Sequence, residues 1–213
     1  MREAAIPLEA TGFTRRMFMA GTVIAASLLG TSAAKARAVI GEASEIRGKV
    51  VRKLDGRELR LKTGGSVQDK DTISTGKESF ADLQLGRGTR VLLGSQTELL
   101  IDSFLADQGG TLELGIGQMI FDRPEGLPKI DVALRTAFGM IGVRGTKFFA
   151  GPNRGAFAVF VEHGLVTVEA GGVTRNVGAG EGIDIASPGA APGEVRRWGA
   201  ARIREAYASV GVR

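Results

Sequence analysis

The sequence predicts an all-β domain of many short antiparallel strands, arranged as a sandwich or a rolled sheet, with a short C-terminal helix. Glycine accounts for 32 of the 213 residues, more than twice the usual share of about 7%. Short runs of alternating apolar and polar residues recur at intervals of roughly 8–12 residues between these glycines. No long helical pattern separates the runs, which argues against a parallel α/β fold. A β-solenoid, also built from short glycine-punctuated strands, is the minority alternative.

In the first half of the domain, the clearest signal is a hairpin. The alternating runs 46–54 and 58–62 flank Asp55-Gly56, and an Asp-Gly pair suits the type I′ turn that joins two such strands. The glycines of Gly86-Arg87-Gly88 are expected to turn the chain back between two later strands. A short strand is expected around 71–73, within the segment 67–75. Further strands are expected at 79–85, 89–93, 98–101, 111–114 and 118–121, the last two as a pair.

In the second half, strands alternate with glycine-rich turns, one of which is expected at 139–145. The strands are expected at 130–134, 146–150, 156–161, 165–170, 173–177 and 182–185.

The C-terminal segment differs from the strands before it. Residues 187–193 are rich in Pro, Gly and Ala and predict a linker. Residues 194–210 have helical spacing, and we expect the helix to pack its Trp and Tyr against the β domain. A partner-binding or membrane-surface role for this helix is the alternative. The stripe on its expected apolar face consists of Trp198, Arg202, Ile203, Tyr207 and Val210.

The N-terminal segment predicts a twin-arginine export signal. Arg15 and Arg16, with Phe18 two residues later, precede an apolar run over 17–29, which is too short to be a good membrane span. Ala36-Arg37-Ala38 is an A-x-A site, so we expect cleavage between Ala38 and Val39 and a periplasmic product. An uncleaved signal, tethering the domain to the inner membrane, is the alternative.

The predicted organisation is a signal peptide at 1–38, a β domain at 39–186, and the linker and helix at 187–213. Residues 39–213 carry 23 basic and 21 acidic side chains, so this near-neutral balance does not imply binding to nucleic acid or to an anionic membrane. The chain has no cysteine and one histidine, which excludes thiol chemistry and argues against a His-rich metal site or a Ser-His-Asp triad. No catalytic, cofactor or metal site is predicted, and no stable membrane span is expected once the signal is cleaved.

Several segments, taken in order, resemble the FecR-like periplasmic domain family, over about residues 45–185. The most distinctive is Ile141-Gly142-Val143-Arg144-Gly145-Thr146-Lys147-Phe148, which resembles the family's G-V-R-G-T-x-F core. The others are Gly65-Ser66-Val67, Asp71-Thr72-Ile73, Thr75-Gly76, Ala81 to Leu92, Gly115 to Gln118, Val161 to Val168 and Val177 to Gly182.

This resemblance implies an all-β periplasmic domain without catalytic activity, which in its best-known members relays the state of an outer-membrane receptor to a cytoplasmic sigma factor. About a dozen residues precede Thr14, so we expect an exported, stand-alone sensory or binding domain rather than an anti-sigma factor. The expected partner is an envelope protein or a cell-wall glycan. An envelope structural or glycan-binding protein is one alternative function, and a hydrolase of envelope polymers is another.

Individual residues support this interpretation to different degrees. Arg144 and Thr146 are the candidate partner contacts: an exposed guanidinium at Arg144 could bind a carboxylate or phosphate, or it could instead fix a tight turn. Asp69 and Asp71 are expected to cap a turn rather than bind calcium, because no EF-hand spacing surrounds them. His163 is expected at an exposed turn.

Overall fold

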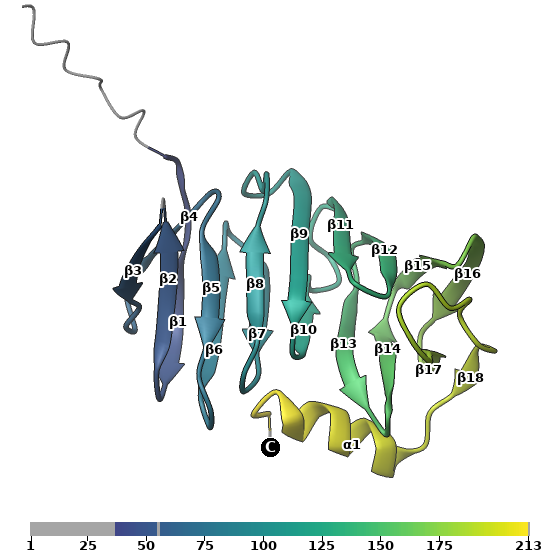
Figure 1. Ribbon diagram of the computed structural model, residues 1–213. Coiled ribbons are helices and arrows are strands. Elements are labelled where there is room, and N and C mark those ends of the chain that lie inside the picture. The colour runs from purple at the N-terminus through teal and green to yellow at the C-terminus, as the bar shows by residue number, and fades with distance from the viewer. Residues whose placement is uncertain (1–36, 55, 213) are drawn as a thin grey trace, which may run out of the picture. The chain divides into compact units, whose positions relative to one another are not determined.

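The computed structural model describes residues 37–54 and 56–212, in which 18 β-strands and one α-helix are present. The strands form two nine-stranded sheets that face each other, with α1 (Ala200–Ser209) at the bottom of the view in Figure 1. This confirms the predicted all-β class with a short C-terminal helix.

Each sheet is a continuous ladder in which every strand pairs with the strands next to it. In spatial order, sheet A consists of β18 (Arg196–Arg197), β17 (Glu181–Ile185), β14 (Ala156–His163), β13 (Lys147–Asn153), β10 (Met119–Asp122), β7 (Thr89–Leu93), β6 (Phe80–Leu85), β1 (Val39–Arg47) and β4 (Ser66–Gln68). Sheet B consists, in the same sense, of β16 (Val173–Gly178), β15 (Leu165–Ala170), β12 (Gly139–Arg144), β11 (Asp131–Thr136), β9 (Gly109–Ile116), β8 (Glu98–Ile101), β5 (Thr72–Thr75), β2 (Val50–Leu54) and β3 (Arg57–Arg60).

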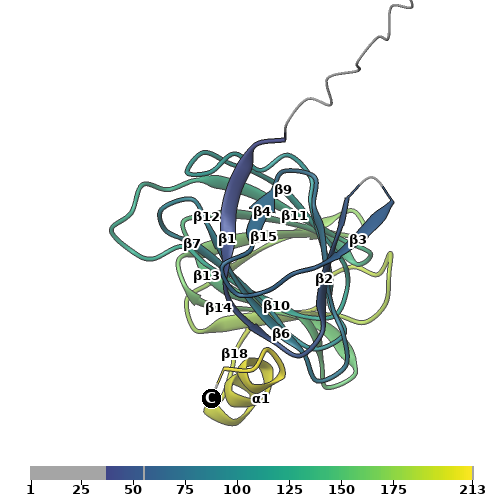
Figure 2. The ribbon, with the colours of Figure 1, turned by 90° about the vertical axis from the view of Figure 1, so that its left-hand side faces the viewer.

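The order of strands along both sheets follows the order of the chain, apart from the swaps of β1 with β4 and of β2 with β3. Figure 2 looks along this stack from the end formed by β1 to β4. In a β-solenoid, the minority alternative, the strands also follow one another along the stack in the order of the chain. The paired strands in the described residues are nevertheless antiparallel, except for the parallel pair β9 and β11.

The main hydrophobic core lies between the two sheets and is built from alternate residues of nearly every strand. Leu83, Leu99, Leu112 and Phe148 are among its fully buried members. Since side chains of a strand point alternately to opposite faces, each strand leaves its other residues on the outside of the stack. Within the described residues, no helix packs against this outer face on sheet B.

On sheet A, a second hydrophobic cluster lies between the outer face and the C-terminal segment. Trp198 is buried and stacks on Phe160, with ring centroids 5.0 Å apart. Ala206 and Val210 of the C-terminal segment are fully buried, and Tyr207 packs against the same cluster. The C-terminal segment therefore packs its Trp and Tyr against the β domain, but only Tyr207 belongs to the helix, since Trp198 precedes α1. The helix is shorter than expected, since Arg196 and Arg197 form β18 and pair with β17.

The predicted hairpin is present as β2 and β3, with Leu54 opposite Arg57 and residues 55 and 56 between them. The expected strand at 46–54, however, is divided. Gly48 has φ +76°, a left-handed conformation that suits glycine. The chain turns there and passes from β1 in sheet A to β2 in sheet B.

Two further expectations differ from the structure. Residues 139–144, expected to belong to a turn, form β12, which pairs with β11 and β15. The strands near 111–114 and 118–121 are present as β9 and β10, but they lie in different sheets and do not pair with each other. Gly117 between them has φ +86°, so the chain crosses from one sheet to the other at this point.

Candidate binding surface

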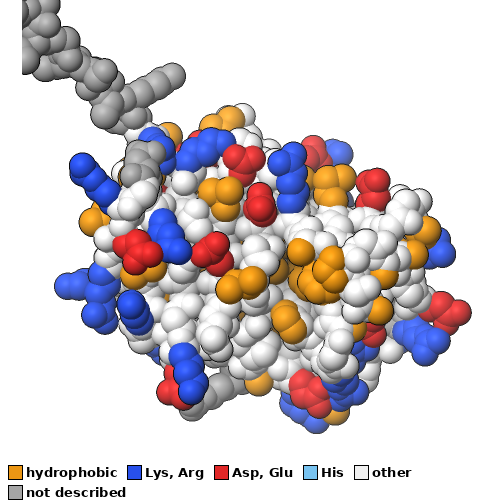
Figure 3. Space-filling model, viewed as in Figure 1, with side chains coloured by type: hydrophobic (Ala, Val, Ile, Leu, Met, Phe, Trp, Pro, Cys, Tyr) orange, Lys and Arg blue, Asp and Glu red, His pale blue; other side chains and the backbone are white. Residues whose placement is uncertain are grey.

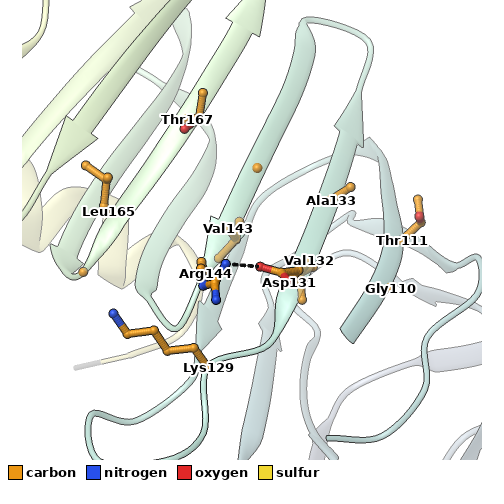
Figure 4. A pocket seen from close by; sticks show the side chains of 12 residues that line it. Gly110, Thr111, Lys129, Asp131, Val132, Ala133, Val143, Arg144, Leu165 and Thr167 are labelled. Carbon is orange, nitrogen blue, oxygen red and sulfur yellow. Dashed lines mark ion pairs between the residues drawn. The ribbon is translucent and has the colours of Figure 1, made fainter. Parts of the chain in front are cut away.

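A shallow groove crosses the outer face of sheet B, the sheet that lies toward the viewer in Figures 1 and 3. Its floor is a row of four residues on neighbouring strands. Ala133 of β11 lies opposite both Thr111 of β9 and Gly142 of β12, and Gly142 lies opposite Thr167 of β15. The groove has a volume of about 730 Å³, and Figure 4 shows it from close by.

The hollow depends on the small size of the floor residues, above all Gly142. A Cβ atom added to Gly142 would come no closer than 3.8 Å to Thr167 O, an ordinary contact distance. Gly142 also has no left-handed φ. Neither crowding nor backbone conformation therefore requires glycine at this position. What the missing side chain provides is open space above the sheet.

One rim of the groove carries charged groups. Asp131 and Arg144 lie opposite each other on β11 and β12, with Arg144 Nη1 3.6 Å from Asp131 Oδ1. Their side chains are 79% and 70% exposed, and an ion pair this exposed contributes little stability, about 0–1 kcal/mol. Arg144 can therefore exchange Asp131 for a carboxylate on a partner at little cost.

Lys129 adds a second positive charge to this rim. It forms no ion pair among the described residues, and it lines the groove beside Arg144. The stem of Lys129 lies across Gly145, since a Cβ atom on Gly145 would come within 2.8 Å of Lys129 Cγ. Gly145 has φ +63°, which also favours glycine. This glycine of the Val-Arg-Gly-Thr segment thus leaves room for the lysine.

Apolar side chains are exposed on the same face. Leu165 at the start of β15 lines the groove and is 52% exposed, and Met140 on β12 is 41% exposed. In Figure 3, hydrophobic side chains appear in the middle and right of this face. None of the residues that line the groove is aromatic. A surface with charged and aliphatic groups but no flat aromatic ring suits a polypeptide better than a sugar ring.

Of the two predicted contacts, the structure brings Arg144 to the rim but places Thr146 beneath it. Thr146 is fully buried, and its Oγ1 donates a hydrogen bond to Leu165 O over 3.0 Å. Thr146 therefore ties the link between β12 and β13 to the first residue of β15 and supports the rim from below.

The structure describes only some of the residues of the predicted export signal and its cleavage site. Arg15, Arg16 and Phe18 lie outside the described residues. Ala38 O accepts a hydrogen bond from Asp69 N–H over 3.1 Å. Val39 is the first residue of β1 and is 63% exposed. The predicted cleavage site thus falls at the start of the first strand.

Asp71 caps its own turn, as predicted, whereas Asp69 bonds the backbone of a different loop. Asp69 Oδ1 accepts a hydrogen bond from Phe104 N–H over 3.0 Å, and Asp71 Oδ2 accepts one from Gln68 N–H over 2.9 Å. Asp71 is fully buried, and this burial raises the pKa of its carboxyl above the ordinary value, despite the opposing effects of the Gln68 hydrogen bond and Arg52.

His163 ends β14, with its side chain 21% exposed and Nδ1 3.8 Å from Glu125 Oε1. The side chain is thus less exposed than the sequence suggested. Across the described residues, no three His, Cys, Asp or Glu side chains are grouped so that they could hold a metal ion. In the same part of the chain, no helix is long and apolar enough to cross a membrane.

Arg144 is the one groove residue that was singled out from the sequence as a contact, and Lys129, Gly142 and Leu165 are among those that were not. A signal for Gly142 was present, because Ile141 and Val143 alternate with Gly142 and Arg144 as in a strand with one buried face. Lys129 and Leu165 carry no comparable signal, since only the folded sheet brings them to the same rim.

Comparison with known proteins identifies the part of the chain that contains the groove. Residues 71–167 match the family described as FecR protein, and this range contains every residue that lines the groove. No curated protein matches the sequence significantly.

Two crystal structures of a candidate anti-sigma factor from Parabacteroides distasonis ATCC 8503, at 2.50 and 1.65 Å resolution, are similar in fold. Each is 22% identical to this chain, with a TM-score of 0.51. The similarity covers 62% of this chain and 62% of the other.

Proposed function

We propose, from the match of residues 71–167 to the family described as FecR protein, that the chain is a non-catalytic signalling module of the cell envelope. It binds a segment of another envelope protein in the groove on sheet B. The observation that carries this proposal is the position of the groove: its floor and its charged rim lie wholly within the FecR domain. The rim includes Arg144 of the distinctive Val-Arg-Gly-Thr segment.

The chemistry of the groove defines the segment that it accepts. Arg144 and Lys129 favour a carboxylate, and Leu165 favours an aliphatic side chain next to it. The small floor residues allow the backbone of the segment to approach the sheet closely. An extended acidic and aliphatic peptide meets these three requirements.

The alternative functions receive less support. Cell-wall glycan binding would be favoured by an aromatic ring in the groove, and the lining residues include none. Glycoside hydrolysis usually needs two carboxylates on either side of the bond, whereas Asp131 is the one acidic residue that lines the groove. The similar fold of the candidate anti-sigma factor is consistent with a role in signalling.

Photo-crosslinking in living cells tests this binding surface. A photoreactive residue replaces Leu165 at the groove or, as the control, Leu59, which is similarly exposed on β3 outside the groove. We expect a discrete protein adduct from position 165 and none from position 59. Adducts of the same mass and yield from both positions, or none from position 165, would contradict the proposal.

A matched pair of glycine variants tests the groove itself. Gly142→Val fills the floor, whereas Gly115→Val adds the same side chain on β9 outside the groove. In both cases the added Cβ atom meets nothing closer than 3.8 Å. We expect Gly142→Val to abolish the adduct from position 165 and Gly115→Val to preserve it. Equal effects of the two variants would exclude the groove as the contact surface.

The proposed location is the periplasm, reached by the twin-arginine route. Intact-mass analysis of fractionated cells tests it. We expect a soluble periplasmic species that begins at Val39. A membrane-bound species that retains Arg15 and Arg16 would contradict cleavage, and a cytoplasmic species would contradict export.

A further inference from the structure

The positive charge of the domain is concentrated at one end of the stack, although its overall balance is near neutral. Residues 39–78 carry nine basic and seven acidic side chains, whereas residues 79–213 carry 14 of each. The first group of residues forms the first five strands, β1 to β5. Lys and Arg side chains accordingly gather at the left side of Figure 3, over β2 and β3.

Many of these basic groups have no acidic partner. Most basic side chains elsewhere are paired, for example Arg154 with Glu205 and Arg202 with Asp184. Five exposed basic side chains at this end form no ion pair among the described residues. We call them the basic end: Lys49, Arg57, Arg60, Lys62 and Lys77.

Four of these side chains, all except Arg57, belong to segments that lie next to one another. Arg60 and Lys62 line a concavity of about 600 Å³ that also includes Gly48, the neighbour of Lys49. Lys49 O in turn accepts a hydrogen bond from Gly76 N–H over 2.8 Å, which places Lys77 on the adjoining turn. Acidic groups on these elements are mostly engaged: Glu58 pairs with Lys53, and Glu45 pairs with Arg47. Glu42 on β1 and Glu78 are exposed acidic groups at this end that form no ion pair among the described residues.

Two further features indicate which anionic partner fits. Leu59 on the edge strand β3 is 48% exposed and lies on the same face of the strand as Arg57, whereas Arg60 lies on the opposite face, so an exposed apolar side chain accompanies one of the positive charges. Basic residues flanking an exposed aliphatic group are typical of a surface that contacts lipid headgroups. The same end contains the start of β1, and the apolar run at 17–29 lies about ten residues before Val39.

We propose that the basic end binds the surface of an anionic lipid bilayer and holds the domain against the membrane with the groove of sheet B accessible. The contact is peripheral and electrostatic, and it requires neither a membrane span nor an uncleaved signal. Each basic group near an anionic bilayer strengthens binding about fivefold at low salt, so several must act together.

Vesicle co-sedimentation of residues 36–213 tests the proposal, because both hydrophobic clusters lie wholly inside this compact unit. Vesicles of phosphatidylcholine with about 30% phosphatidylglycerol are compared with vesicles of phosphatidylcholine alone. We expect binding to the anionic vesicles only, and we expect it to weaken as salt rises from about 50 to about 300 mM, as the Debye length shortens.

A charge-matched pair of variants locates the contact. Arg57→Gln, Arg60→Gln and Lys62→Gln together remove three charges from the basic end, and we expect binding to fall about a hundredfold. The control is Arg175→Gln, Arg197→Gln and Arg204→Gln, which removes three charges of later elements that form no ion pair within residues 37–54 and 56–212, and it should change binding by less than about threefold. An equal loss in both variants, or equal binding to neutral vesicles, would overturn the proposal. Circular dichroism verifies that both variants are folded.

Discussion

The stem of Lys129 lies over Gly145 so closely that a single added methyl group would be 2.8 Å from Lys129 Cγ. This contact holds a basic side chain at the rim of the groove. It also explains why a left-handed glycine follows Arg144, since any other residue there would both strain the backbone and displace the lysine.

Gly145→Ala should therefore lower the free energy of unfolding by more than the backbone strain alone would lower it. A left-handed φ costs a non-glycine residue about 1–2 kcal/mol. Gly172→Ala is the matched control, because Gly172 has φ +74° but no atom within 4 Å of the added Cβ. Urea denaturation of both variants isolates the effect of the Lys129 contact. Equal losses would mean that the lysine moves aside freely.

Thr146→Val should destabilise the domain by about 1–2 kcal/mol, because it removes the buried hydrogen bond to Leu165 O while keeping the side-chain volume. The same substitution at Thr111, on the floor of the groove, should change the free energy of unfolding by less than about 0.5 kcal/mol. Urea denaturation measures both. A Thr146→Val variant as stable as the parent would show that the hydroxyl is dispensable.

Asp71→Asn should raise stability at neutral pH. Burial raises the pKa of Asp71, so the ionised carboxylate is disfavoured by folding. The stability linked to its protonated form is fully present below the unfolded-state pKa and is lost as the pH rises through the higher pKa of the folded state. The asparagine keeps an acceptor for Gln68 N–H and removes the charge.

Thermal unfolding between acidic and neutral pH measures this effect. The parent should lose stability as the pH rises through the window that begins at the unfolded-state pKa, and Asp71→Asn should lose less. Asp71→Ala, which lacks the acceptor, serves as the destabilised control. If Asp71→Asn is clearly less stable at pH 7, the ion pair with Arg52 outweighs the cost of burying the charge.

Trp198→Ala should cost about 3–5 kcal/mol, as is usual when a large buried aromatic side chain is removed. Trp198 stacks on Phe160, and its ring lies over Gly182, where an added Cβ would come within 2.3 Å of Trp198 Nε1. Trp198→Phe preserves part of the stacking and should lose less. Circular dichroism is the appropriate probe, since the chain has one tryptophan. A small loss for Trp198→Ala would mean that the C-terminal segment adds little to the fold.

The sequence predicted best those strands that form short apolar runs without an internal glycine. The predicted bounds of Thr89–Leu93, Glu98–Ile101 and Leu165–Ala170 agree with β7, β8 and β15. Strand β12 was missed because Gly139 and Gly142 occupy two of its six positions and conceal the alternation. The sheet to which each strand belongs was not predictable, because crossings such as Gly117 depend on contacts between residues distant in the sequence.

The candidate site was predictable only in part, for a similar reason. Arg144 stands in a distinctive segment and could be singled out. The other contributors are ordinary residues, and they become a surface only when the register of β9, β11, β12 and β15 aligns them. The chemistry of one side chain can be predicted from the sequence, whereas the groove forms only when the register of four strands brings its residues together.

The near-sequential order of strands makes this domain almost one-dimensional, with each strand held mainly by the strands beside it in the stack. In such an arrangement, stability is approximately a sum of local terms and of interfaces between neighbours. We expect the terminal strands β3, β4, β16 and β18, which have a neighbour on one side only, to open most readily, and amide protons to exchange faster there than in β9 to β13. Loosening at the end formed by β3 and β4 can thus proceed while the groove stays intact, so that the proposed membrane attachment and the proposed recognition of a partner would be mechanically independent.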